Sequence, residues 1–285
     1  MKDKILKLLG EKGDLPPLPE ILLKLEKLIG DPDSDIEAIA ELIETEPVLS
    51  GRLIKLANSV LFGGGREKAR DLSSAILRLG IKMILDLAYT IQLPNMFSKF
   101  KSFDQFLFWK HSLAVACLTQ GLAQKADLSY EEKEESYVCG LMHDLGIVVF
   151  GYLIPEEYKN FVASAKIREF SLELLEREQF GISHPELGSA FIQKQWPVSP
   201  TVIQAVKEHH DPFVVNGSRP TLSQIVHIAN QVANAHGITH GIGLPPTWEI
   251  DDTILKFLGL SQEEFEKVLE RTLEGLDSAE TAMKG

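Results

Sequence analysis

Residues 130–150, near the middle of the 285-residue chain, have the sequence YEEKEESYVCGLMHDLGIVVF, which indicates the fold most clearly. It begins with acidic residues, which suit the positive end of a helix dipole, and continues into an apolar run. His143 and Asp144 follow the first part of that run directly and precede Gly146. We therefore predict a helix over Tyr130–Phe150 that carries an imidazole and a carboxylate into an apolar setting.

Helical periodicity continues outward from this stretch in both directions. In Pro19–Ile29, for example, apolar residues recur at i, i+3, i+4 and i+7, which turns one face of a helix toward a core. No run alternates with period 2 over more than a few residues, so no strand is predicted. The further predicted helices span residues 36–43, 47–57, Ser73–Leu79, Ile81–Ile91, Asp104–Lys125, Glu156–Glu176, His184–Gln195, Ser199–Glu208, Leu222–Ala235 and Gln262–Leu276. The sequence predicts an all-α fold.

Two interruptions in the helical pattern suggest how the chain is divided. A short polar stretch covers Pro94–Phe103, and a loop rich in glycine and proline covers Gly237–Pro246. We predict an N-terminal helical lobe over residues 1–97, a second multi-helix lobe over residues 98–245 on which the first lobe packs, and a C-terminal helical tail over residues 246–285 that packs on the body.

Composition narrows the classes of protein to consider. The chain has 29 basic and 41 acidic residues and a net charge of −12, which argues against a nucleic-acid partner because such binding needs a basic face. Cys117 and Cys139 lack metal-binding spacing and suit a reducing compartment. The most apolar stretch, Gly146–Pro155, is about half the ~20 residues that a membrane helix needs. We expect a soluble, cytoplasmic protein with no membrane partner.

The histidines carry the chemical signal. His143 and Asp144 offer two neighbouring metal ligands, and the carboxylate can bridge two cations. Taken singly, each histidine is better explained as a hydrogen-bonded structural residue than as a metal ligand. For the set as a whole, the structural and the metal-binding interpretations are evenly matched. The candidate metal ligands are His111, His143, Asp144, His184, His209 and His210. Imidazole and carboxylate together suit iron, manganese or zinc, and the sequence does not rank these three.

The order of these residues resembles the HD superfamily of metal-dependent phosphohydrolases, especially its HD-GYP branch, which degrades cyclic dinucleotides. Over residues 12–275 the chain also resembles the HDOD family, the HD-related output domain. The segments that carry the likeness are Leu15-Pro16-Pro17-Leu18-Pro19, Asp31-Pro32-Asp33, Glu46-Pro47-Val48-Leu49, Leu56-Ala57-Asn58-Ser59, Ala75-Ile76-Leu77-Arg78-Leu79-Gly80, Trp109-Lys110-His111-Ser112, Gly140-Leu141-Met142-His143-Asp144-Leu145-Gly146, Phe180-Gly181-Ile182-Ser183-His184, Gly188 and Trp196-Pro197.

The resemblance implies a ligand set for two metals that share Asp144. His111 and His143 match one metal position, and His184, His209 and His210 match the other. It also implies an all-helical, HD-like second lobe and a role in bacterial signalling, in a family whose members are thought to have lost hydrolytic activity.

Three departures from the active enzymes bear on catalysis. Asn230 stands where a late aspartate ligand would fall, and Ile147 replaces the lysine that follows the His-Asp pair. The Gly-Tyr-Pro signature is absent from the segment after His210. Losing a carboxylate ligand weakens one metal position, and losing a lysine removes a cation that would stabilise a phosphoryl group.

Three hypotheses follow from the residues and the resemblance. The leading one is a stand-alone, non-catalytic signalling module that binds metal and acts through a regulatory protein partner. The alternative is a working metal-dependent phosphohydrolase acting on a nucleotide or cyclic dinucleotide, with Asn230 or His227 replacing the missing ligand. The third is a receptor that binds a nucleotide without cutting it.

Overall fold

The chain folds into two units that consist of helices and connecting loops. The computed structural model describes residues 1–11, 16–63, 67–98, 102–165, 170–211, 219–243 and 248–283. One unit comprises Met1–Pro17 and Phe97–Val268, and the other comprises Leu18–Met96 and Leu269–Gly285. No strand occurs in the described segments, so the all-α prediction is confirmed. Leu15 of the quoted motifs and residues 244–246 of the predicted Gly- and Pro-rich loop lie outside them.

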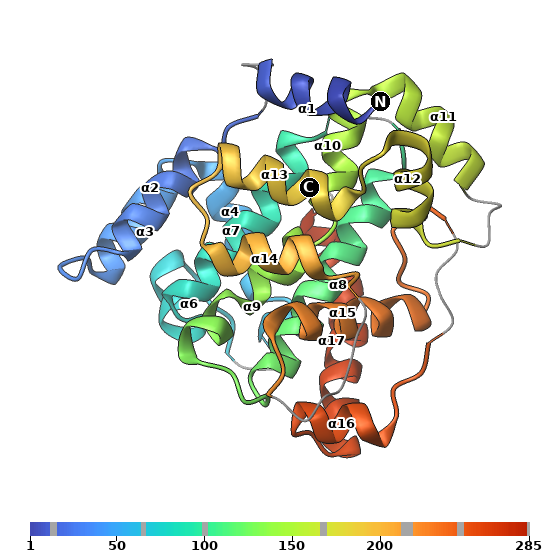
Figure 1. Cartoon of the computed structure of the whole chain (residues 1–285). Coiled ribbons are helices and arrows are strands. Elements are labelled where there is room, and N and C mark those ends of the chain that lie inside the picture. Colours follow the sequence, from blue (N-terminus) through green and yellow to red (C-terminus); the bar gives the residue numbers. More distant parts are fainter. Residues whose placement is uncertain are drawn as a thin grey trace. The chain divides into compact units, whose positions relative to one another are not determined.

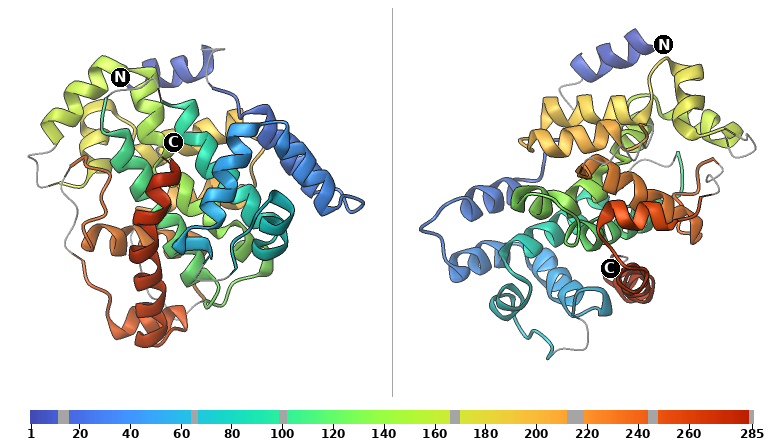
Figure 2. Two further views of the ribbon diagram at one scale, coloured as in Figure 1. Left: turned by 180° about the vertical axis from the view of Figure 1, so that it is seen from behind. Right: turned by 60° about the horizontal axis from the view of Figure 1, so that its bottom comes forward.

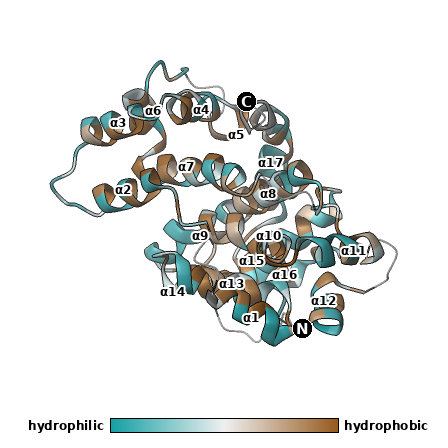
Figure 3. Ribbon diagram, turned by 90° about the horizontal axis from the view of Figure 1, so that it is seen from above, coloured by the Kyte–Doolittle hydropathy of each residue, from teal (hydrophilic) through white to brown (hydrophobic). Residues whose placement is uncertain are grey.

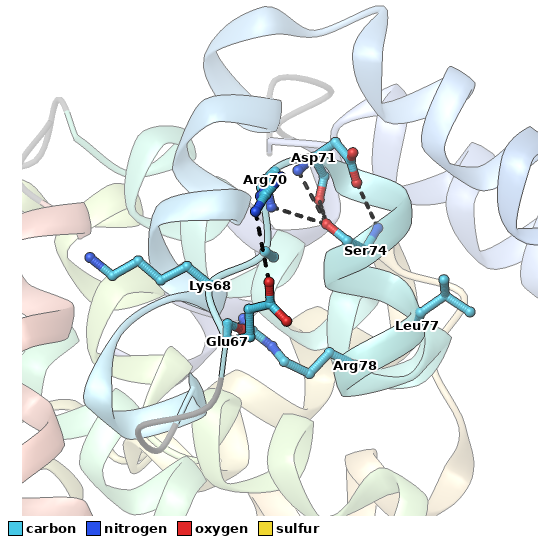
Figure 4. A pocket seen from close by; sticks show the side chains of 8 residues that line it. Glu67, Lys68, Arg70, Asp71, Ser74, Leu77 and Arg78 are labelled. Atoms are coloured by element: carbon cyan, nitrogen blue, oxygen red, sulfur yellow. Dashed lines mark hydrogen bonds and ion pairs between the residues drawn. The ribbon is translucent and has the colours of Figure 1, made fainter.

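The smaller unit begins with six helices, two of which start at a side-chain cap. Asp35 caps one helix by accepting a hydrogen bond from the Ala38 N–H at 2.8 Å. Asp71 and Ser74 form a capping box at the start of another, as Figure 4 shows. These helices are α2 (Glu20–Ile29), α3 (Ile36–Glu44), α4 (Pro47–Ala57), α5 (Val60–Gly63), α6 (Leu72–Leu79) and α7 (Ile81–Met96).

Asn58 ends α4 and ties three segments of this unit together. Its side-chain amide donates to the Ala69 carbonyl at 2.9 Å and accepts from the Ala69 N–H at 2.8 Å. The Arg78 guanidinium also reaches Asn58 Oδ1 and donates to the Ala57 carbonyl. The sequence pattern predicts a helix end at this position with Asn58 bonded to backbone, and the structure confirms it.

Helix α7 runs further than its predicted end. The sequence predicts Ile81–Ile91, closed before Pro94, whereas α7 continues to Met96 with Pro94 inside it. A proline in a helix interior removes one backbone hydrogen bond. Pro94 lies in the last turn of α7, two residues before its end at Met96, so the interruption affects only that turn.

The larger unit contains the helices that carry the candidate ligands. They are α1 (Lys2–Glu11), α8 (Gln105–Ala123), α9 (Tyr130–Met142), α10 (Leu145–Leu153), α11 (Pro155–Ala165), α12 (Leu172–Phe180), α13 (His184–Gln195), α14 (Pro200–Glu208), α15 (Leu222–Ala235), α16 (Asp252–Leu258) and the first part of α17 (Gln262–Met283). Helix α8 packs against α9 and α15, and α13 lies beside both α10 and α14 (Figures 1 and 2). Helix α1 packs on α10 in this unit.

Two predicted helices are each divided in the structure. The predicted Tyr130–Phe150 helix breaks at His143 and Asp144, between α9 and α10. The predicted Glu156–Glu176 helix is replaced by α11 and α12, the second of which starts after Ser171 in an extended conformation. The side chains of His143 and Asp144 lie at the first of these breaks, between the buried end of α9 and the buried start of α10.

Helix α10 is the most apolar element of the larger unit and is coloured accordingly in Figure 3. Together with α9 it forms the stretch Tyr130–Leu153, which in the described residues is long and apolar enough to cross a membrane. However, 94% of its most apolar window is buried inside the protein, as is usual for a core helix. The burial of α10 is what places the His143–Asp144 junction deep in the unit.

Candidate metal centre

Six side chains from five helical segments converge inside the larger unit. His111 lies within α8, His143 and Asp144 form the junction of α9 and α10, and His184 is the first residue of α13. His209 and His210 directly follow α14. The structure therefore brings together the predicted candidates His111, His143, Asp144, His184, His209 and His210.

Asp144 lies at the middle of the cluster, and each of its oxygens faces two imidazoles. Oδ2 is 3.1 Å from His143 Nε2 and 3.6 Å from His111 Nε2. Oδ1 is 3.2 Å from His184 Nε2 and 3.3 Å from His209 Nε2. The carboxylate thus divides the histidines into two groups, which are the two groups that the resemblance implies.

Two of the imidazoles are oriented by the helices that they end. His143 Nδ1 lies 2.8 Å from the Gly140 carbonyl, and His209 Nδ1 lies 2.8 Å from the Val206 carbonyl. The last carbonyls of a helix lack partners within the helix, so each ring can donate its Nδ1–H there. This choice of tautomer leaves the Nε2 lone pair directed toward Asp144.

The other two imidazoles are held by longer-range contacts. His111 Nδ1 lies 2.7 Å from the Ile238 carbonyl. His184 Nδ1 lies 2.7 Å from Glu176 Oε2, which also accepts the His184 backbone N–H at 2.6 Å. The opposite oxygen of Glu176 accepts from the Tyr158 hydroxyl at 2.7 Å. In all four rings, a partner at Nδ1 directs Nε2 into the centre.

The ionisation of these groups reflects deep burial around one negative charge. Burial lowers the pKa of His111 to about 3 and that of His209 to about 4. Burial opposes ionisation of Asp144, but the imidazoles around it hold its pKa well below the usual value. Burial also acts to lower the pKa of His184, yet Glu176 and Asp144 on its two sides raise it to about 10. Positive charge is therefore favoured at His184, between the two buried carboxylates.

The donor atoms fit a divalent metal ion. The Nε2 atoms of the four imidazoles and both Asp144 oxygens are buried and have no hydrogen-bond partner. Buried polar atoms are rarely left in this state without an ion or water. Two ligands held about 2.1 Å from one ion stand roughly 3.0–3.4 Å apart, close to the 3.1–3.6 Å found between Asp144 and the imidazoles. The cluster can therefore bind a metal.

His210 extends the second group. Its ring centroid lies 4.2 Å from that of His209 and 5.1 Å from that of His184. A ligand atom of His210 falls within 4.8 Å of those of Asp144, His184 and His209. The second group thus offers three imidazoles and a carboxylate oxygen, while the first offers two imidazoles and the other oxygen.

The sequence pattern does not single out Glu176, Tyr158 or His240. Glu176 is fully buried and holds His184, as metal-binding histidines are usually held by a carboxylate or carbonyl at the other ring nitrogen. Its signal is local: it lies four residues after Leu172 and one after Leu175, on the buried face of α12. A carboxylate on an apolar stripe is rare, so this position indicates a buried and paired Glu176.

The two candidates for a replacement ligand have other contacts. His227 Nδ1 lies 2.8 Å from the His209 carbonyl, and the ring is half-buried. Asn230 is buried, and its Oδ1 accepts from Asn234 Nδ2 at 2.8 Å. His240, which no sequence pattern connects with the cluster, lies with its ring centroid 5.3 Å from that of His111.

Replacing Glu176 by glutamine is expected to weaken metal binding by about 10–100-fold, the usual effect of losing such a supporting contact. Three donors converge on Glu176, from Tyr158 and from the His184 backbone and ring. A glutamine has one acceptor oxygen and no negative charge, so either Tyr158 or His184 loses its acceptor, and the carboxylate that attracts the His184 Nδ1 proton is gone. Metal titration of the stripped protein measures the effect.

Glu178→Gln is the matched control, because Glu178 is exposed on the same helix. It should leave metal affinity unchanged. A Glu176→Gln protein that binds metal as tightly as the wild type, or that loses only thermal stability, would contradict the positioning role.

Comparisons with known proteins add a family and a fold. The sequence model of the HDOD domain matches residues 15–212. An uncharacterized protein of Treponema pallidum (strain Nichols) is 27% identical over 268 residues, which cover 94% of this chain but 50% of that protein. The chain thus spans about half the length of this curated relative.

Two solved structures share the fold. A protein named "Putative phosphohydrolase" from Shewanella amazonensis SB2B superposes with a TM-score of 0.75 at 22% identity, covering 99% of this chain and 98% of the other. An HDOD domain protein with unknown function from Geobacter sulfurreducens superposes with a TM-score of 0.73 at 24% identity, covering 96% and 88%. At these identities the likeness concerns the fold, whereas the sequence match spans more than two thirds of the chain. The chain belongs to the HDOD domain family.

Proposed function

We propose that this chain is a non-catalytic signalling module of a bacterial pathway, in which the histidine–aspartate cluster binds divalent metal as a structural or sensory element. The ligands would be His111 and His143 on one side of Asp144, and His184, His209 and His210 on the other. When bound, the ion would supply positive charge beside the buried Asp144 carboxylate. Iron, manganese and zinc all suit this donor set.

The observation that carries the non-catalytic part is Ile147. It occupies the position of the lysine in His-Asp-x-Gly-Lys and is fully buried in α10. Phosphodiester hydrolysis needs positive charge on the phosphoryl oxygens in addition to a metal-activated water. A buried isoleucine cannot supply that charge, so this chain would hold metal without stabilising the transition state.

The output is proposed to pass through a regulatory protein partner in the cytoplasm. Neither Cys117 nor Cys139 forms a disulfide, which fits a reducing compartment. Family membership supports a signalling role, since HDOD denotes an output domain related to the HD enzymes. The partner would bind the exposed surface of the helical units, leaving the metal centre buried.

The alternative is a metal-dependent phosphohydrolase acting on a nucleotide or cyclic dinucleotide. One specific observation favours it: each Asp144 oxygen faces its own group of imidazoles, so two adjacent ions could be held. The Shewanella amazonensis neighbour carries a phosphohydrolase name. A two-metal site can support in-line phosphoryl chemistry, although this chain lacks the lysine.

Metal analysis combined with an activity assay separates the two proposals. The purified full chain is loaded with iron, manganese or zinc, and phosphate and nucleotide products are followed over a panel of nucleotides and cyclic dinucleotides. We expect stoichiometric metal and turnover far below ~1 per second, a modest enzyme rate. Turnover at or above that rate that disappears on removal of the metal would establish the phosphohydrolase instead.

A further inference from the structure

A cavity of about 230 Å³ adjoins the second ligand group of the metal centre. His184 and His210 line it on the side of the cluster. Helix α15 contributes three amide side chains to another wall, namely Asn230, Gln231 and Asn234. The cavity therefore places a polar helix face next to the candidate metal ligands.

The wall of this cavity carries hydrogen-bonding groups and almost no formal charge. Hydroxyls of Ser171 and Thr239 accompany the amides, and Glu173 is its one carboxylate in the described part of the chain. No lysine or arginine is among the described residues that line the cavity. Arginine and lysine are the usual partners of phosphate and carboxylate groups. The lining therefore fits a neutral polar ligand better than one with several phosphates.

The amides present a defined pattern of donors and acceptors. Asn234 Nδ2 donates to Asn230 Oδ1 at 2.8 Å, which leaves Asn230 Nδ2 as a donor and Asn234 Oδ1 as an acceptor. Gln231 Oε1 is buried and accepts no hydrogen bond. A buried acceptor without a donor is unfavourable, so a ligand that brings an N–H or O–H group to Gln231 Oε1 would satisfy it.

Imidazole rings complete the lining. His210, His227 and His240 all border the cavity. His240 Nδ1 accepts the Ile242 N–H at 3.1 Å, so its neutral ring carries the proton on Nε2 and can donate. Histidine rings are among the side chains on which nucleobases stack. Rings beside amide donors and acceptors suit a flat heterocycle with hydrogen-bonding edges.

The volume limits the size of the ligand. A cavity of about 150 Å³ holds benzene, and pockets for drug-sized ligands begin near 300 Å³. At about 230 Å³ the cavity fits one or two fused rings. We propose that it binds a nucleobase, free or in a nucleoside, beside the metal centre; this inference rests on the metal-binding function proposed above and names the ligand that the module senses.

The test is calorimetric titration of the full chain after its metal content has been measured. The probes are adenine, guanine, cytosine, uracil, their four nucleosides, a cyclic dinucleotide and inorganic phosphate. At least one base or nucleoside is expected to bind with a Kd below about 1 mM and more tightly than the cyclic dinucleotide or phosphate. Gln231→Leu should weaken that binding by about tenfold and leave the metal content unchanged.

Gln193→Leu is the matched control, since Gln193 is exposed on α13 and lies outside the cavity lining. Asn234→Leu is the second variant if Gln231→Leu fails to fold. A metal-loaded protein that binds no base or nucleoside, that prefers the cyclic dinucleotide, or that binds a base regardless of both cavity variants overturns the inference. A wild-type protein that takes up no metal instead overturns the proposed function.

Discussion

Replacing Asp144 by asparagine is expected to lower metal affinity by at least about 100-fold, more than the loss of a supporting contact would. Each oxygen of Asp144 faces two imidazole nitrogens at 3.1–3.6 Å, so one substitution affects both ligand groups. An amide keeps one oxygen but brings no negative charge, and its nitrogen cannot act as a ligand. Elemental analysis and metal titration of the purified variant measure the loss.

Asparagine is the sharper substitution because it should preserve the fold. Its amide nitrogen can donate a hydrogen bond to His209 Nε2, which lacks a partner. Asp252→Asn, at an exposed position of α16, serves as control and should keep full metal content. If the Asp144→Asn protein retained wild-type metal affinity, the metal would bind at a site other than this cluster.

The ligand candidates could be predicted because their signals are local in the chain. His143-Asp144 and His209-His210 are adjacent pairs directly after apolar helices. Once the order of the motifs suggests the family, their meeting point follows from the known arrangement of such folds. The all-α class follows from periodicity for the same reason, since apolar spacing within one helix needs no knowledge of its neighbours.

The contacts of the supporting groups could not be predicted because they join residues that lie far apart in the sequence, even though the position of Glu176 on the buried face of α12 has a local signal. Tyr158 meets Glu176 18 positions later, and His111 meets the Ile238 carbonyl 127 positions later. No periodicity within one helix encodes such pairs. The sequence does not predict the break between α9 and α10 for a related reason: the apolar run continues across it, whereas Asp144 at the break contacts His184 of α13, 40 positions later.

The close packing of α13 on α10 depends on Gly146. Replacing Gly146 by alanine is expected to destabilise the protein by about 3 kcal/mol or more, at the upper end for overpacking in a core. A Cβ atom on Gly146 would lie 1.9 Å from the His184 carbonyl oxygen and 2.9 Å from the Gly188 nitrogen. Both are backbone atoms of α13, so no side-chain rotation relieves the clash. Urea unfolding followed by circular dichroism measures the change.

Gly151→Ala is the matched control in the same helix. A Cβ there meets its nearest atoms, in Ser102 and Phe103, at 3.5–3.7 Å, which is ordinary contact. Because alanine is about 1 kcal/mol better than glycine within a helix, Gly151→Ala should be neutral or stabilising. If both variants unfold at the same urea concentration, the close packing of α10 on α13 does not limit stability. If Gly146→Ala alone is destabilised and also binds metal poorly, then the glycine contact that lets α13 approach α10 is also what brings His184 within reach of Asp144.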